Sequence, residues 1–177
     1  HKVFPGGHVT ACGANSPSSL ASRPCRIILC DEVDRYPLSA GTEGDPVSLA
    51  KKRSTTFWNR KIIMVSTPTD KGASRIEAAY EESDKRRYFV PCQDCGEHQV
   101  LKWSNVKWEE GKPASAEYVC EHCGSCWSDV KRFAAIRYGE WRKTAEGDGK
   151  TAGFHLSGLY SPWTPMEDTV RDFLASK

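Results

Sequence analysis

Two cysteine pairs constrain the fold of this chain more than any other feature of its sequence. They are Cys92-x-x-Cys95 and Cys120-x-x-Cys123, with 24 residues between the pairs. Four thiolates from two such pairs can surround one tetrahedral Zn²⁺, so the segment between the pairs has to bring the chain back to its starting point. The gap is slightly longer than the usual range of roughly 15 to 20 residues. The pattern still predicts a small β unit built around one zinc ion.

We expect this zinc site to be structural, because four thiolates leave no open coordination position for catalysis. Gly96 and Gly124 each follow the second cysteine of a pair, where they permit the tight turn that such a site requires. A small β unit has too little core to fold unaided, and metal binding would supply that stability. Three further residues are rival ligands by spacing or proximity: Cys126, His98 and His122.

The rest of the sequence favours a metal site over a set of disulfide bonds as the role of these cysteines. A framework made from the eight cysteines would be typical of a small secreted domain, but the N-terminal HKVFPGGHVT lacks the features of a signal peptide. No apolar run approaches the roughly 20 residues of a membrane span. Cys12, Cys25 and Cys30 have no pair spacing and are expected to be core thiols. We therefore expect a reducing compartment, and the missing initiator Met indicates a fragment of a longer protein.

The first part of the chain alternates between strand and helix patterns. Arg26 to Cys30 (RIILC) and Lys61 to Val65 (KIIMV) are continuous apolar runs, which suit parallel strands covered on both faces. Asp45-Pro46 is typical of a helix start, with Asp45 as the N-cap. A second helix is expected over Ala73 to Ser83. This alternation favours an α/β layer with a parallel sheet.

Shorter elements are expected elsewhere. Strands are predicted at Val9 to Cys12, Tyr88 to Val90, Gln99 to Leu101, Tyr118 to Val119 and Phe154 to Leu156, and a loop with at most one helical turn at 13 to 24. A helix is expected from Asp129 to Tyr138, ended by Gly139. Thr164-Pro165-Met166-Glu167 matches a capping box, so a last helix is predicted to run to Lys177. The predicted domains are 1–85, 86–138 and 139–177.

Two acidic residues follow the first apolar run. Asp31 and Glu32 would emerge at the carboxyl end of a parallel strand, where open α/β sheets bind ligands. One carboxylate can hold Mg²⁺ through its water shell, and the next can activate a water that attacks a γ-phosphate, as in the Walker B arrangement of nucleotide hydrolases. The alternative is a solvated acidic turn. Asp34 and Arg35 are expected to be structural, pairing locally or capping the next segment.

Hydroxyl side chains follow the second apolar run. Ser66 and Thr67 precede Pro68, which directs the chain out of the strand. If the two strands are neighbours, these hydroxyls would lie beside Asp31 and could sense a γ-phosphate; the alternative is a local turn. No G-x-x-x-x-G-K-[ST] loop occurs in the chain, so it is not expected to hydrolyse ATP alone.

Aromatic and basic residues are scattered around the cysteine pairs. A net charge of +2 neither indicates nor excludes nucleic-acid binding. Interleaved aromatic and basic side chains could contact a nucleic-acid backbone, but we favour tryptophans that pack the ribbon onto its neighbours while the cations stay solvated. The residues concerned are Trp103, Trp108, Trp127, Trp141, Lys102, Lys107, Arg132, Arg137 and Arg142.

The order and spacing of four segments resemble a known family. RPCRIILCDEVDRYP, then MVSTPT, then the C-x-x-C ribbon, then GFHLSGLYSPW is similar to the large terminase subunit of tailed bacteriophages, in its lambda-like branch. The resemblance implies an α/β fold, here a partial P-loop NTPase parallel sheet with an appended small β zinc ribbon. It gives Asp31 the Mg-ATP role and Glu32 the catalytic role. It places Ser66, Thr67 and Pro68 in the motif that couples hydrolysis to movement.

Partners and cofactors follow from the same resemblance. It implies ATP, Mg²⁺ and structural Zn²⁺, and a motor that moves double-stranded DNA into a procapsid. The implied partners are the small terminase subunit, the portal and further copies of the chain, with no membrane. The implied place is the host bacterial cytoplasm, docked at the portal. The nuclease activity would reside outside this fragment, since no nuclease acidic cluster is identifiable. Residues 139–177 would be a linker and the start of the nuclease domain, with Phe154 to Trp163 resembling its lead-in.

Two other functions fit the same residues less completely. A helicase of the DE-x-D type would use Asp31 and Glu32 in the same roles but would need a second motor domain. The chain could instead be a non-enzymatic zinc-ribbon module that binds nucleic acid, and the acidic residues at the strand end would then be present by chance. Replacing Glu32 separates an ATPase from a binding module, because only the ATPase would lose turnover.

Overall fold

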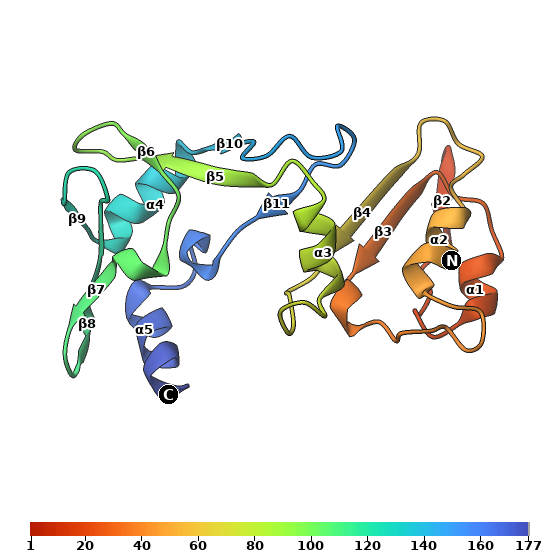
Figure 1. Cartoon of the computed structure of the whole chain (residues 1–177), viewed down its shortest axis with the longest axis horizontal. Coiled ribbons are helices and arrows are strands. Elements are labelled where there is room, and N and C mark those ends of the chain that lie inside the picture. The colour runs from red at the N-terminus through yellow and green to blue at the C-terminus, as the bar shows by residue number, and fades with distance from the viewer. Residues whose placement is uncertain (177) are drawn as a thin grey trace. The chain divides into compact units, whose positions relative to one another are not determined.

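The computed structural model describes residues 1–176 as a mixed α/β chain with small sheets. The chain folds as two compact units, His1–Ala79 and Tyr80–Lys177, and we describe each by itself (Figure 1). Within residues 1–176, no helix combines the length and the apolar character of a membrane-spanning segment. The functional division into domains at residues 85 and 138 stays a prediction.

The first unit contains a hairpin, a two-stranded parallel sheet and short helices. Its elements are β1 (Lys2–Phe4), β2 (Gly7–Val9), α1 (Pro17–Ala21), β3 (Ile27–Asp31), η1 (Val33–Arg35), α2 (Pro46–Lys52), β4 (Lys61–Val65) and α3 (Arg75–Glu81). The predicted strand at Val9 to Cys12 is wrong, because the strand ends at Val9 and pairs antiparallel with β1. Gly6 in the connecting turn has φ +85°, a conformation that glycine adopts without strain.

The two apolar runs form β3 and β4, which pair in parallel (Figure 1). Ile28 and Cys30 point into a small core that includes Val33 and Val47. The expectation that both faces of the strands are covered is wrong for the described residues, because Leu29 on the other face is 71% exposed. Side chains alternate along a strand, so one apolar run supplies both a core face and a face that other segments have to cover.

Helix α2 begins as predicted. Asp45 is its N-cap, and the Asp45 carboxylate accepts a hydrogen bond from the Ser48 amide at 2.8 Å. Pro46 occupies the first helical position, where no amide hydrogen is needed. This start packs Val47 against β3 and sets the direction of the segment that leads to β4.

The second unit contains two antiparallel-rich sheets and two helices. Its elements are β5 (Arg86–Pro91), β6 (His98–Gln99), η2 (Trp103–Asn105), β7 (Val106–Glu109), β8 (Lys112–Val119), β9 (Cys126–Trp127), α4 (Asp129–Arg137), β10 (Glu140–Arg142), β11 (Phe154–His155), η3 (Gly158–Tyr160) and α5 (Met166–Ala175). Strand β5 pairs with β10, β11 and β6, and β8 pairs with β7 and β9. The β7–β8 hairpin, which turns at Gly111 with φ +72°, is longer than the short strand predicted at Tyr118.

One hydrophobic core contains residues from the segment with the two cysteine pairs, which we call the ribbon, and from the end of the chain. Tyr118 and Trp127 are buried together with Tyr160, Met166 and Val170 from the last forty residues. The Tyr160 hydroxyl donates to the Tyr88 carbonyl at 2.7 Å and accepts from the Leu101 amide at 2.8 Å. The residues after the ribbon are therefore part of the same compact unit.

The start of α5 differs from the prediction. Pro165 is the N-cap, no side chain of the Thr164 segment caps the helix, and the Asp129 carboxylate accepts from the Met166 amide at 3.2 Å. Asp129 in turn pairs with Arg132, whose guanidinium is 1% exposed and donates to the Thr164 carbonyl at 2.8 Å. A tertiary carboxylate thus replaces the expected capping box. The helix ends at Ala175, and Lys177 lies outside the described residues.

Candidate active site and metal centre

The ends of β3 and β4 bring the predicted acidic and hydroxyl residues to one edge. Asp31 is the last residue of β3 and is in register with Val65, so Ser66 follows at the same edge (Figure 1). The prediction that Asp31 and Ser66 lie on the same edge of one sheet is confirmed. Asp31, Glu32 and Thr67 are exposed there, where their side chains are accessible to a ligand.

Glu32 has an unusual backbone conformation. Its φ of 53° and ψ of 48° lie in the left-handed region, which is uncommon for a residue with a side chain. The residue is the N-cap of η1, and its carbonyl accepts from the Arg35 amide at 2.9 Å. Val33, which is fully buried, holds the turn in place. The chain therefore turns sharply at Glu32, and strained residues of this kind cluster at functional sites.

Asp34 connects the turn after β3 to the segment after β4. Its amide donates to the Ser66 hydroxyl at 3.2 Å. Its carboxylate accepts from the Thr69 amide at 3.0 Å and from the Ile76 amide, in the first turn of α3, at 2.9 Å. The structural role that we expected for Asp34 is confirmed, but the contacts are long-range. Asp34 therefore links the segment after β4 to the turn that follows Asp31 through hydrogen bonds.

Burial opposes ionisation of Asp34, but the hydrogen bonds from Ser74, Ile76 and Thr69 outweigh it, and the pKa of the carboxyl lies below its usual value. We expect Asp34→Ala to weaken the local structure by about 1–2 kcal/mol at neutral pH, since it removes a helix cap. Hydrogen exchange at the Ile76 amide should then be roughly five- to thirtyfold faster. Because the folded pKa is the lower one, this contribution is complete above about pH 4 and is lost as the pH falls through the folded value.

The matched control for this variant is Asp70→Ala, which removes an exposed acid of the same charge from the same unit. It should leave exchange at Ile76 unchanged. Equal exchange rates in the wild type and Asp34→Ala would contradict the connecting role of Asp34.

Arg75 is a residue of this region that sequence reasoning missed. Its guanidinium donates to the Val33, Tyr36 and Pro37 carbonyls at 3.1, 2.9 and 2.7 Å. It also lies 3.3 Å from the Asp45 carboxylate. Helix α3 therefore holds the segment after Glu32 through one side chain. No local sequence pattern predicts a contact between residues about forty positions apart.

The four predicted cysteines converge in the second unit. The Sγ atoms of Cys92, Cys95, Cys120 and Cys123 all lie within 4.8 Å of one another. Two of the separations are 3.8 Å, between Cys92 and Cys123, and 4.0 Å, between Cys95 and Cys120. Zinc–sulfur bonds of about 2.3 Å in a tetrahedron require sulfur separations of roughly 3.8 Å, so the donor set fits one zinc ion.

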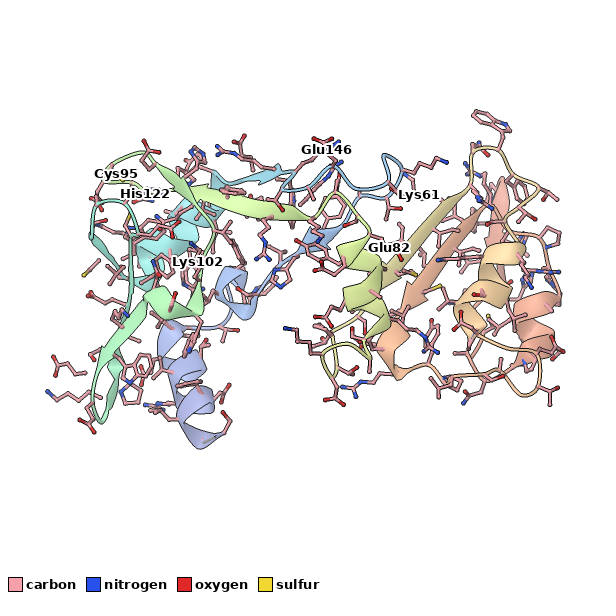
Figure 2. All side chains as sticks on the ribbon, viewed as in Figure 1. Lys61, Glu82, Cys95, Lys102, His122 and Glu146 are labelled. Carbon is pink, nitrogen blue, oxygen red and sulfur yellow. The ribbon has the colours of Figure 1, made fainter. Side chains whose placement is uncertain are left out.

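Both cysteine pairs lie on the same kind of tight loop. The amide of Gly96 donates to the Cys92 carbonyl at 2.8 Å, and the amide of Gly124 donates to the Cys120 carbonyl at 3.0 Å. The two glycines have φ of +77° and +74°, as the sequence predicted. Figure 2 labels Cys95 on the first of these loops. The first cysteine of each pair is buried and the second is exposed, so the core fixes one side of the cluster.

Two polar side chains that sequence reasoning missed contact the sulfurs. Gln99 Nε2 donates to Cys120 Sγ at 3.2 Å, while its Oε1 accepts from the Glu121 amide at 3.0 Å. Ser125 Oγ lies 3.5 Å from Cys92 Sγ and 3.3 Å from Cys123 Sγ. Such neighbours orient metal ligands and stabilise thiolates.

The thiols of the cluster have opposed pKa shifts. Burial raises the pKa of Cys92, but hydrogen bonds from Ser125 and from backbone amides outweigh this effect and lower it to about 6. The Glu97 amide favours the Cys95 thiolate, yet burial and the neighbouring sulfurs raise its pKa to about 12. Closely spaced sulfurs cannot all become anionic without a compensating positive charge nearby.

The rival ligands lie outside the cluster. Cys126 is an exposed residue of β9, and its thiol contacts Glu117. The His122 ring, labelled in Figure 2, lies 3.8 Å from the Glu121 carboxylate. Among residues 1–176, the four cysteines form the only group of three or more His, Cys, Asp or Glu side chains close enough to share a metal ion.

The scattered tryptophans pack onto neighbouring side chains, and four of the five cations are exposed, as we favoured. Trp127 is buried against Tyr118, and Arg132 is buried against backbone carbonyls. Trp103 and Trp108 are partly buried and lie against Phe173 of α5, with ring centroids 5.0 and 6.2 Å from it. These contacts account for the aromatic residues around the ribbon without a nucleic acid.

Comparisons with known proteins point to one family. The family described as "Phage terminase large subunit gpA, ATPase domain" matches residues 1–141. The chain is 31% identical over 185 residues to the terminase large subunit of Enterobacteria phage P21, covering 92% of this chain and 29% of that protein. It is 28% identical over 202 residues to that of Escherichia phage lambda, covering 99% of this chain and 31% of that protein. No solved structure matches the chain significantly.

Proposed function

Since this chain belongs to the phage terminase large subunit family, matching its gpA ATPase domain, we propose that it is part of the ATP-hydrolysing motor that drives double-stranded DNA into a procapsid. It spans 29% and 31% of the two curated relatives, so the activity is that of a longer protein. The observation that carries the proposal is the shared edge of β3 and β4, where Asp31 and Glu32 stand beside Ser66.

The roles follow from the positions of these side chains. Asp31, at the rigid end of a strand, would hold the metal of Mg-ATP through its water ligands, since carboxylate oxygens suit Mg²⁺. Bound Mg²⁺ would neutralise charge on the β- and γ-phosphates. Glu32, at the sharp turn, would accept a proton from the water that attacks the γ-phosphate. The sheet with these residues is one part of a P-loop NTPase domain, and the phosphate-binding loop would come from elsewhere in the longer protein.

Coupling would start at Ser66 and Thr67. Ser66 is bonded to Asp34, and Asp34 is bonded to Thr69 and to the first turn of α3. Loss of the γ-phosphate would shift the hydroxyl segment, and the hydrogen bonds of Asp34 would carry that shift to α3. Arg75 would carry the same shift back to the backbone that follows Glu32.

The ribbon would bind one structural zinc through Cys92, Cys95, Cys120 and Cys123. We place the endonuclease activity outside these residues, in another part of the longer protein. The working motor would be a homo-oligomer in the host bacterial cytoplasm, docked at the procapsid portal with the small terminase subunit. Residues 1–177 alone would not hydrolyse ATP.

A magnesium titration tests the role of Asp31. In a longer terminase subunit that includes this chain, Asp31→Asn should raise the Mg²⁺ concentration for half-maximal ATP hydrolysis by about tenfold or more, because a second-sphere carboxylate is lost. Glu43→Gln, which neutralises an exposed acid of the same unit, is the control and should match the wild type. A magnesium dependence that Asp31→Asn leaves unchanged would exclude Asp31 from the metal site.

A further inference from the structure

The two units differ in charge more than the overall value suggests. Residues 1–79 contain eleven Lys and Arg against seven Asp and Glu, a net charge of +4. Residues 80–177 contain fourteen against sixteen, a net charge of −2. The positive charge of the chain therefore resides in the unit that carries β3 and β4.

Within the first unit the two signs are separated along the chain. Residues 1–30 and 46–69 contain no Asp or Glu, so the acids lie in the segments around Asp31 and around α3. The cations gather instead where β3 and β4 begin. We call this surface the basic edge, and it consists of Arg26, Lys51, Lys52, Arg60 and Lys61 together with Trp58.

The fold holds the basic edge together. The Lys61 amide donates to the Arg26 carbonyl at 2.9 Å, which places the two strand starts side by side. The Arg53 carbonyl accepts from the Cys25 amide at 3.1 Å, which brings the end of α2 to the same place. Figure 2 labels Lys61 on β4. Because β3 and β4 are parallel, this edge is the opposite end of the sheet from Asp31, about 16 Å away at strand spacing.

The side chains of the basic edge are available to a partner. All five cations are exposed, and within residues 1–176 none of their side chains forms an ion pair or hydrogen bond. Trp58, in the loop between Lys52 and Lys61, is 95% exposed. Clustered cations without nearby acids create a positive potential that attracts polyanions. The exposed indole of Trp58 among these cations adds an apolar surface against which a sugar can pack.

We propose that the basic edge binds the phosphate backbone of double-stranded DNA, with Trp58 packed against deoxyribose. This inference rests on the proposed function, which supplies duplex DNA as the polyanion. It places the DNA contact at the far end of the sheet from the nucleotide. Strands β3 and β4 would then contact the nucleotide at their carboxyl ends and DNA at their amino ends. A movement of these strands would therefore displace both sites.

Salt-dependent binding tests the inference on the zinc-loaded 177-residue chain. The probe is a fluorescent duplex of about 30 base pairs, with affinity measured by anisotropy over a range of salt concentrations. Each phosphate contact contributes a slope of about −0.9 to the logarithmic plot of affinity against salt. Arg60→Gln/Lys61→Gln should reduce the magnitude of the slope by about two and lower affinity about tenfold near 0.1 M salt. Trp58→Ala should weaken binding without changing the slope.

The matched control is Lys71→Gln/Lys150→Gln, which removes the same charge at exposed positions outside the basic edge. It should bind like the wild type. Equal losses in the two double variants would mean that net charge alone attracts DNA, and wild-type binding by Arg60→Gln/Lys61→Gln would exclude the basic edge; either result overturns the inference. Neither of these binding results depends on ATP turnover. The proposed function is therefore tested separately, by the magnesium titration of Asp31→Asn.

Discussion

Removing the zinc ion that we propose for Cys92, Cys95, Cys120 and Cys123 should unfold the ribbon. Structural zinc in small domains contributes about 10–16 kcal/mol of apparent binding free energy, which is also folding free energy. The buried sulfurs of Cys92 and Cys120 belong to the same core as Tyr118 and Trp127. Without the metal, these two buried sulfurs would be left uncompensated in the core and would destabilise it. A chelator should therefore abolish the near-ultraviolet circular dichroism of the packed Tyr118–Trp127 pair, whose ring centroids are 5.3 Å apart.

The sequence provides a closely matched pair of variants for this prediction. Cys120→Ser removes a converging sulfur, and Cys126→Ser removes an exposed thiol with the same C-x-x-C spacing from Cys123. Metal analysis should find one zinc per chain in the wild type and in Cys126→Ser. Cys120→Ser should bind zinc more than about 100-fold more weakly. Full zinc content in Cys120→Ser, or its loss in Cys126→Ser, would show that the ligands are misassigned.

Local patterns predicted the elements whose causes are local. Asp45 and Pro46 start α2 because an N-cap and a first-turn proline act within one helical turn. Each cysteine pair forms a tight loop because the turn is set by the four residues of the pair and the glycine that follows. The two apolar runs pair in parallel as predicted, but their register places Ile27, and not Arg26, opposite Lys61, so that Asp31 lies beside Val65.

Predictions failed where a distant residue determines the local structure. Thr164 has the pattern of a capping box, but its segment provides no side-chain cap, and the Asp129 carboxylate accepts from the Met166 amide instead. Arg75 and Asp34 hold the site through contacts that span 32 to 42 positions, and no spacing rule identifies such partners. One face of β3 is exposed, contrary to the prediction, because an apolar run does not specify which distant segments cover it.

Glu32 is the residue whose replacement should have the largest effect on turnover. A general base typically contributes about 10²- to 10⁴-fold to a rate. Gln has nearly the same shape as Glu but cannot accept the proton of the attacking water. The left-handed turn at position 32 and its hydrogen bond to Arg35 involve the backbone, so the replacement should leave them intact. Nucleotide affinity should therefore stay close to the wild-type value.

The most direct test measures ATP turnover and ATP binding together, in a longer terminase subunit that includes this chain. Glu32→Gln is compared with the wild type and with Glu43→Gln, which has the same chemical change at an exposed residue of the same unit. We predict that only Glu32→Gln loses turnover, by about 10²-fold or more, while all three bind ATP equally. Wild-type turnover in Glu32→Gln would contradict the assignment of the β3 edge as the site of hydrolysis.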